Sequence, residues 1–146
     1  MAPYLVLDTN VFVAAGFNPR SNSARILERV RDGTWAAVWN RATRRETEAV
    51  LARIPPLAHL AAEETAFRPE AEFTAETHPE RFSAVEDPDD RKFAALAAAT
   101  GAVLVTNDDH LLSQREAIGV EVLTPSEVMA RYGPADGGRV QDQSEA

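Results

Sequence analysis

The 146-residue chain contains no cysteine, a single lysine and three histidines. Without cysteine, disulfide scaffolds, zinc ribbons and thiol nucleophiles are all excluded. His59, His78 and His110 stand far apart in the sequence, which argues against a histidine-rich transition-metal site. Any mechanism that requires a lysine has Lys92 as its one candidate, because the rest of the 15 basic residues are arginines.

The sequence also lacks a hydrophobic run that approaches the roughly 18 residues of a membrane-spanning helix. Its first residues carry no basic leader, and Asp8 interrupts the initial apolar stretch, which disfavours a signal peptide. We therefore expect a cytoplasmic protein without a membrane partner.

Hydrophobic residues make up 45% of the chain and charged residues 26%, which predicts one globular domain with a sizeable core. The net charge of -8 excludes a generally basic nucleic-acid-binding surface. A cluster of metal-binding carboxylates also makes a protein acidic, so a nucleic-acid enzyme stays compatible with this charge. Small and polar residues predict a disordered tail over residues 133–146, after a domain of residues 1–132.

Short apolar segments alternate with helical patterns along the chain. We expect strands at residues 4–7, 35–39, 102–106 and 120–123. Helices are expected at residues 23–31, 43–54, 57–67, 87–100 and 125–132. A helix or turn is expected at 11–17 and a short helix or two turns at 108–117, and residues 68–85 show no clear pattern. This alternation predicts an α/β fold, a three-layer α/β/α sandwich with a central parallel sheet.

Two acidic residues, Asp8 and Asp108, follow predicted strands. Because ligands of parallel sheets bind at the carboxyl ends of the strands, both carboxylates are candidates for a site at that edge. The alternative role for each is that of a helix N-cap.

A third acid, Asp90, lies at the head of the alanine-rich helix, on the face that carries Phe93, Ala94 and Ala97. This position predicts that its carboxylate lies near the edge of the sheet rather than in open solvent. The alternative is a capping box, with Asp87 as the N-cap residue and Asp90 three residues later.

A fourth acid, Glu46, is predicted to interrupt the apolar stripe that Ala42, Ala49 and Val50 form on its helix. Burial of a carboxylate without a partner costs several kcal/mol. We therefore expect Glu46 either to join a site with the other acids or to form an ion pair with Arg53, which lies on the same face.

Together the four acids suggest one carboxylate cluster, whose mutual repulsion a cation would neutralise. Oxygen ligands and the absence of cysteine favour Mg²⁺ or Mn²⁺ over zinc. Two such ions, roughly 3.5–4 Å apart, can activate a water and stabilise the leaving oxygen in phosphodiester cleavage.

Four segments together resemble, in order and spacing, the acidic motifs of the PIN-domain ribonucleases. They are residues 5–13 (LVLDTNVFV), 45–51 (RETEAVL), 87–93 (DPDDRKF) and 105–112 (VTNDDHLL). The resemblance extends over residues 4 to about 130, and it is to the branch of toxin–antitoxin toxins near the VapC-like nucleases. It implies a PIN-like fold.

The resemblance also implies an activity, partners and roles for single residues. The chain would be a metal-dependent endoribonuclease that hydrolyses RNA phosphodiester bonds, a toxin held inactive by an antitoxin protein, and a homodimer. Asn10 and Thr106 match polar residues of the motifs that support the acidic residues. The residues that would bind Mg²⁺ or Mn²⁺ and act in catalysis are Asp8, Glu46, Asp90 and Asp108.

The chain departs from the family pattern at three positions. Ala14 stands where serine is common, Arg91 where a second acid is common, and His110 where aspartate is common. These departures bear on the strength of a second metal site. His110 is either a surface residue or a contact to substrate or metal.

Basic and aromatic residues near the predicted site carry weaker signals. Arg44 and Arg45, together with Arg41, either contact RNA phosphates or form a solvated helix face. Trp35 and Trp39 either belong to the core or stack on bases.

Two other functions are compatible with parts of the sequence. A non-catalytic, PIN-like protein-binding module would need none of the acids. A Mg²⁺-dependent phosphatase of the haloacid dehalogenase class needs a second aspartate two residues after the nucleophile, where this chain has Asn10, and a lysine on a motif of its own, whereas Lys92 sits beside Asp90.

Overall fold

The computed structural model describes residues 2–134, so most of the predicted C-terminal tail lies outside the described residues. Four parallel strands form one sheet in the order β2-β1-β3-β4. Leu5 lies opposite Ala37 on one side and Val103 on the other, which sets the register of the central strands. The strands are β1 (Tyr4–Leu7), β2 (Ala36–Ala37), β3 (Val103–Val105) and β4 (Val122–Leu123).

Within residues 2–134, α-helices and short 3₁₀ turns connect and cover the strands. The helices are α1 (Thr9–Phe17), α2 (Asn22–Arg31), α3 (Arg41–Ala52), α4 (Ala58–Glu63), α5 (Arg91–Thr100), α6 (Asp109–Ser113), α7 (Arg115–Ile118) and α8 (Pro125–Tyr132). The turns are η1 (Pro55–Leu57), η2 (Pro69–Ala71), η3 (Pro79–Arg81) and η4 (Pro88–Asp90). Each turn begins with proline, whose fixed φ suits the first helical position. None of these helices is long and apolar enough to cross a membrane.

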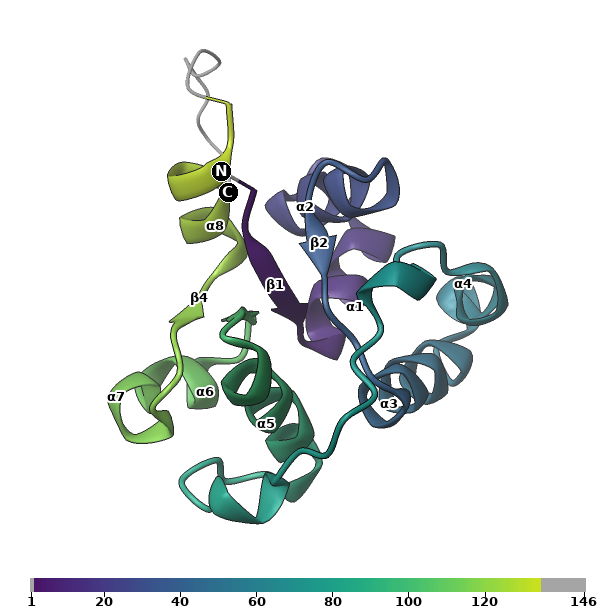
Figure 1. The fold of residues 1–146 in the computed structure, drawn as a ribbon. Coiled ribbons are helices and arrows are strands. Elements are labelled where there is room, and N and C mark those ends of the chain that lie inside the picture. Colours follow the sequence, from purple (N-terminus) through teal and green to yellow (C-terminus); the bar gives the residue numbers. More distant parts are fainter. Residues whose placement is uncertain (1, 135–146) are drawn as a thin grey trace.

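The two faces of the sheet carry separate apolar clusters. Leu5, Leu7 and Val105 pack with residues of α1, α2, α3 and α8, whereas Val6 and Leu104 pack with residues of α5, α6 and α7. Successive residues of a strand point to opposite faces, so a continuous apolar run serves both clusters. Figure 1 shows α1 to α4 on the right of β1, α5 below it, and α6 and α7 at its lower left. The predicted three-layer α/β/α sandwich with a parallel sheet is confirmed.

The strand order creates a topological switch point between β1 and β3. After β1 the chain adds β2 on one side of it, and later adds β3 on the other side. Ligands of open parallel sheets bind beyond the carboxyl ends of the strands at such a point. Here the N–H of Asp8 donates to the carbonyl oxygen of Val105 (3.0 Å), so the ends of β1 and β3 are held side by side.

Polar cap residues set the starts of the helices around this edge. The Ser21 hydroxyl accepts a backbone hydrogen bond at the start of α2. Asn40 and Thr43 form a capping box at the start of α3, and Thr124 and Glu127 form another at the start of α8. Such caps satisfy backbone N–H groups that have no partner within the helix, which fixes where each helix begins.

The strand predicted at residues 35–39 is shorter in the structure, where β2 contains two residues. Trp35 and Trp39 flank it, and their burial makes both of them core residues. Trp39 forms an isolated parallel bridge with Glu72, and its Nε1 donates to the carbonyl oxygen of Arg68 (2.8 Å). The start of the segment at 68–85, which showed no clear pattern, therefore lies beside β2, and its η3 turn contacts α5.

The helix predicted at residues 57–67 is wrong in its second half, because α4 ends at Glu63. The next residue, Glu64, turns inward and accepts hydrogen bonds from Arg31 Nε (3.0 Å) and Nη2 (2.8 Å). Its carboxylate also accepts the backbone N–H of Ala66 (2.9 Å). These bonds satisfy a buried carboxylate and end the helix at this point.

The apolar stripe predicted for α3 is also wrong. Ala42 and Ala49 are exposed, and Glu46 lies beside the buried face rather than within it. Thr47 is buried because its hydroxyl forms a hydrogen bond with the Thr9 hydroxyl of α1 (2.9 Å). The side chains that α3 buries are Thr43, Thr47 and Leu51.

Candidate metal centre

Asp8 is the most buried of the four candidate acids, with 3% of its surface exposed. It follows β1 directly and is the N-cap residue of α1. Its Oδ1 accepts the backbone N–H of Thr9 (2.8 Å). Its Oδ2 accepts the Thr106 hydroxyl (2.7 Å) and Asn10 Nδ2 (3.2 Å). The predicted cap role of Asp8 is therefore observed, and the same carboxylate stands at the switch point of the sheet.

Thr106 and Asn10 connect the ends of β1 and β3. The Thr106 hydroxyl, which is fully buried, accepts Asn10 Nδ2 (3.3 Å) and the backbone N–H of Asp108 (2.9 Å). Asn10 Oδ1 accepts the backbone N–H of Asn107 (3.0 Å). Asn10 and Thr106 thus fix the position of Asp8 relative to the loop that carries Asp108. The backbone contact of Asn107 was not predicted.

Burial raises the pKa of Asp8 to about 6, although the hydrogen bonds from Thr106 and Thr9 act in the opposite direction. Charge repulsion from Asp108 and Glu46 is a smaller part of the same upward shift. A carboxylate at this position is ionised at neutral pH only against unfavourable desolvation and repulsion.

Asp90 lies at the end of η4, where α5 begins. Its carboxylate makes no capping hydrogen bond; the cap of this turn is Asp87, whose Oδ1 accepts the N–H of Asp89 (3.0 Å). The predicted capping box is therefore half right, because Asp87 caps and Asp90 does not. Burial raises the pKa of Asp90 to about 7, and repulsion from Asp8, Asp87, Asp108 and Glu46 adds to this effect.

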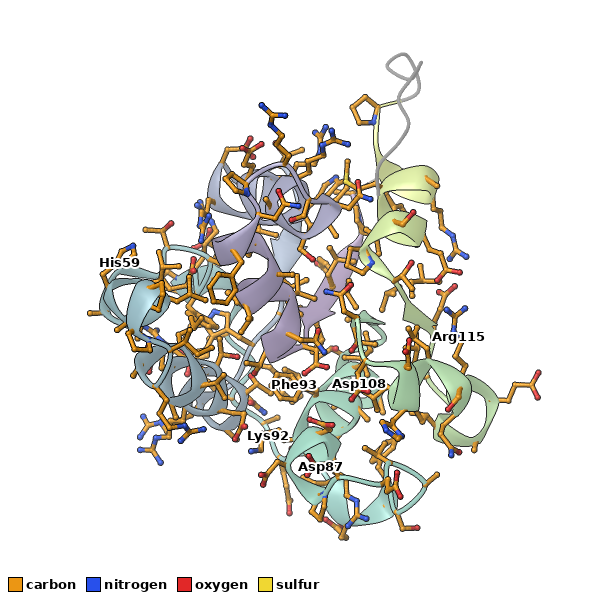
Figure 2. All side chains as sticks on the ribbon, turned by 180° about the vertical axis from the view of Figure 1, so that it is seen from behind. His59, Asp87, Lys92, Phe93, Asp108 and Arg115 are labelled. Atoms are coloured by element: carbon orange, nitrogen blue, oxygen red, sulfur yellow. The ribbon has the colours of Figure 1, made fainter. Side chains whose placement is uncertain are left out.

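Asp108 is the N-cap residue of α6, and its Oδ1 accepts the backbone N–H of His110 (2.9 Å). With Asp87 and Asp90 it lines a cavity of about 270 Å³. Figure 2 shows Asp87 and Asp108 in the same region as Phe93 of α5. The contribution of Asp87 to this acidic cavity was missed, since the sequence indicated a capping role alone.

Glu46 reaches the same region from α3. Its Oε1 accepts a hydrogen bond from Lys92 Nζ (3.1 Å), and the two side chains are 26% and 23% exposed. The ion-pair partner is thus the single lysine, not the predicted Arg53. Glu46 is still close enough to Asp8 and Asp90 to raise the pKa of each.

The basic residues near α3 differ in their contacts. Arg44 Nε pairs with Glu48 (2.8 Å), and its guanidinium lies over the rings of Trp39 (5.1 Å) and Phe67 (4.9 Å). Arg45 is exposed. Of the three arginines considered as phosphate contacts, Arg44 is thus already engaged in packing and an ion pair, and Arg41 is exposed like Arg45.

His110 also lies on the surface. Its side chain is 79% exposed, and its Nδ1 lies 3.4 Å from the carboxylate of Glu86.

The donor set at this edge fits a hard divalent cation. Its acidic side chains come from four elements and offer oxygen ligands only, which suits Mg²⁺ or Mn²⁺. Burial first, and repulsion between the acids second, raise the pKa values of Asp8 and Asp90, and a bound cation would offset both effects. Among residues 2–134, no three acidic or histidine side chains are already gathered as closely as a bound ion would hold them.

Acidic residues from four elements lie at the switch point of a parallel sheet. This arrangement is typical of α/β domains that bind ligands at the carboxyl edge of the sheet. A family model described as a PIN domain matches residues 4–110, which include all four acids. The chain belongs to the PIN domain family. PIN domains are generally nucleases and generally use divalent metals. No curated protein matches the chain in sequence.

Proposed function

We propose that the protein is a Mg²⁺- or Mn²⁺-dependent endoribonuclease that hydrolyses phosphodiester bonds of RNA. The observation that carries this proposal is the carboxylate of Asp90. It is half-buried, accepts no hydrogen bond from the described residues, and is surrounded by the charges of Asp8, Asp108 and Glu46. A structural role needs a partner for such a group, whereas a metal site needs it free.

Asp8, Asp90 and Asp108 would hold the cation, with Glu46 bound directly or through water. When bound, a divalent cation lowers the pKa of a coordinated water and polarises the phosphate. Thr9, Asn10 and Thr106 hold the carboxylate of Asp8 in one orientation, so that its charge needs no rearrangement when substrate arrives. Hydrolysis would leave a 3′-hydroxyl and a 5′-phosphate.

We further propose that residues 1–132 form the nuclease domain of a cytoplasmic toxin, which acts as a homodimer and is inhibited by a cognate antitoxin protein. The likeness of residues 5–13, 45–51, 87–93 and 105–112, taken together, to the PIN-domain branch near the VapC-like nucleases supports this part of the proposal. Exposed Arg45, with Arg44 beside it, is proposed to contact RNA phosphates at the margin of the site.

The test is cleavage of single-stranded RNA with Mg²⁺ or Mn²⁺ and, separately, with a chelator. We expect cleavage that requires metal and is lost in Asp8→Asn and Asp90→Asn. Asp89→Asn is the matched control, because it removes the same charge from the exposed neighbour of Asp90. A folded protein that binds RNA or a protein partner but never cleaves would support the binding module instead.

A further inference from the structure

A groove with a volume of about 470 Å³ lies between the first turns of α1 and the starts of α2 and α8. Val13, Ala14 and Pro125 contribute its aliphatic part, and Asn22, Asn107 and Ser126 contribute amide and hydroxyl groups. In Figure 2 the purple ribbons of α1 and α2 lie to the left of the yellow-green α8, with Asp108 below them.

The groove is continuous with the acidic site through two asparagines. Asn10 lines the groove, and its Nδ2 also donates to Asp8 Oδ2 (3.2 Å). Asn107 lines the groove as well, and its backbone N–H donates to Asn10 Oδ1 (3.0 Å). A strand whose phosphate lies at Asp8 therefore has the groove directly beside it.

The lining offers a nucleobase both an apolar surface and polar groups. None of the residues that line the groove is charged, so it offers no ion pair to a phosphate. An aliphatic surface with a few convergent polar groups matches the apolar faces and hydrogen-bonding edges of an unstacked base. Its volume lies within the range of pockets that hold small ligands, which is about 300–1,000 Å³.

The side-chain amide of Asn107 is held in a defined position. Asn107 Nδ2 donates to the hydroxyl of Ser23 (3.3 Å), which is 2% exposed. Among the described residues, the side-chain carbonyl of Asn107 and the hydroxyl of Ser126 have no hydrogen-bond partner of their own. They are the groups available to the edge of a base.

We infer that this groove binds the base of the nucleotide next to the scissile phosphate and so sets the sequence preference of cleavage. This inference rests on the proposed ribonuclease function, because it identifies the occupant from the substrate of the neighbouring site. The base would insert against Val13 and Ala14, while Asn107 and Ser126 contact its edge.

The experiment titrates the metal-free protein with adenosine, cytidine, guanosine and uridine, and separately with inorganic phosphate, while NMR follows the amide signals. We expect at least one nucleoside to shift the signals of Asn22, Asn107 and Ser126. Ala14→Leu fills the groove and is expected to lower the affinity for that nucleoside at least about tenfold. Its Mn²⁺ affinity and unfolding temperature, which report on the acidic site and the fold, are expected to match wild type.

Three results would overturn the inference: no shift with any nucleoside, shifts that Ala14→Leu leaves unchanged, or shifts at the same residues with phosphate alone. In an active enzyme, Asn107→Ala and Ser126→Ala are expected to change the base preference at one position beside the cut. RNA cleavage without nucleoside binding would refute this inference alone. Nucleoside binding without any metal-dependent cleavage would refute the proposed function, and the groove would then be a nucleoside site without a role in cleavage.

Discussion

Replacement of Asp90 by asparagine is expected to stabilise the metal-free protein. The carboxylate has a pKa of about 7 in the folded state, compared with an ordinary value of 3.8. This difference corresponds to at most about 4 kcal/mol of unfavourable free energy when the group is ionised. Because Asp90 is only half-buried, screening by solvent reduces the expected gain from Asp90→Asn to about 1–2 kcal/mol.

The pH dependence of this gain follows from the sign of the shift. A raised pKa means that the folded state holds its proton more tightly than the unfolded chain does. The wild-type protein therefore loses stability as pH rises from about 4 to about 7, and the whole penalty is present at pH 8. The advantage of Asp90→Asn is largest at pH 8 and shrinks as pH falls towards 4.

The assay is urea unfolding in the presence of a chelator at pH 8 and pH 5. Asp89→Asn serves as the control, since Asp89 is exposed and one residue away. The reasoning is refuted if Asp90→Asn is no more stable than wild type at pH 8, or if Asp89→Asn shows the same gain. With saturating Mn²⁺ the wild type should become more stable than Asp90→Asn, because metal binding stabilises the wild type and not this variant.

Three further predictions concern the surroundings of the site. Thr106→Val removes the hydroxyl that donates to Asp8, so we expect the free energy of unfolding, measured by thermal unfolding, to fall by about 1–3 kcal/mol. RNA cleavage by this variant should also be slower. Lys92→Gln removes the cation that pairs with Glu46; calorimetry should then show tighter Mn²⁺ binding, and weaker binding would mean that Lys92 positions Glu46 for the metal. Arg44→Ala removes the contacts of the guanidinium with two aromatic rings and should lower the stability by about 1–2 kcal/mol, as chemical denaturation would show.

The sequence was sufficient to predict the edge of the sheet where Asp8 and Asp108 lie. Asp8 and Asp108 each follow an apolar strand, and parallel strands end at the same edge. The position of Asp90 was predictable from its helix face, because the face of α5 that carries Phe93 packs on the sheet. The functional role of these acids stays a prediction until metal binding is measured.

The position of Glu46 on α3 was harder to predict from the sequence. The hydrophobic pattern favoured Ala49 over Thr47 as a buried residue. In the structure Thr47 is buried, because its hydroxyl forms a hydrogen bond with the hydroxyl of Thr9. The partner Lys92 lies 46 positions away in sequence, and helical spacing carries no signal for such a pair. Polar burial depends on partners that only the tertiary structure supplies.

The most direct test of the metal centre is calorimetric titration of Mn²⁺ into the metal-free protein. Wild type would be measured beside Asp8→Asn, Asp90→Asn and the control Asp89→Asn. The account predicts that wild type and Asp89→Asn bind Mn²⁺ and that both other variants lose this binding while still folded. A folded wild type that binds no Mn²⁺, alone or with an uncleavable RNA, would contradict the account, as would binding that survives both substitutions.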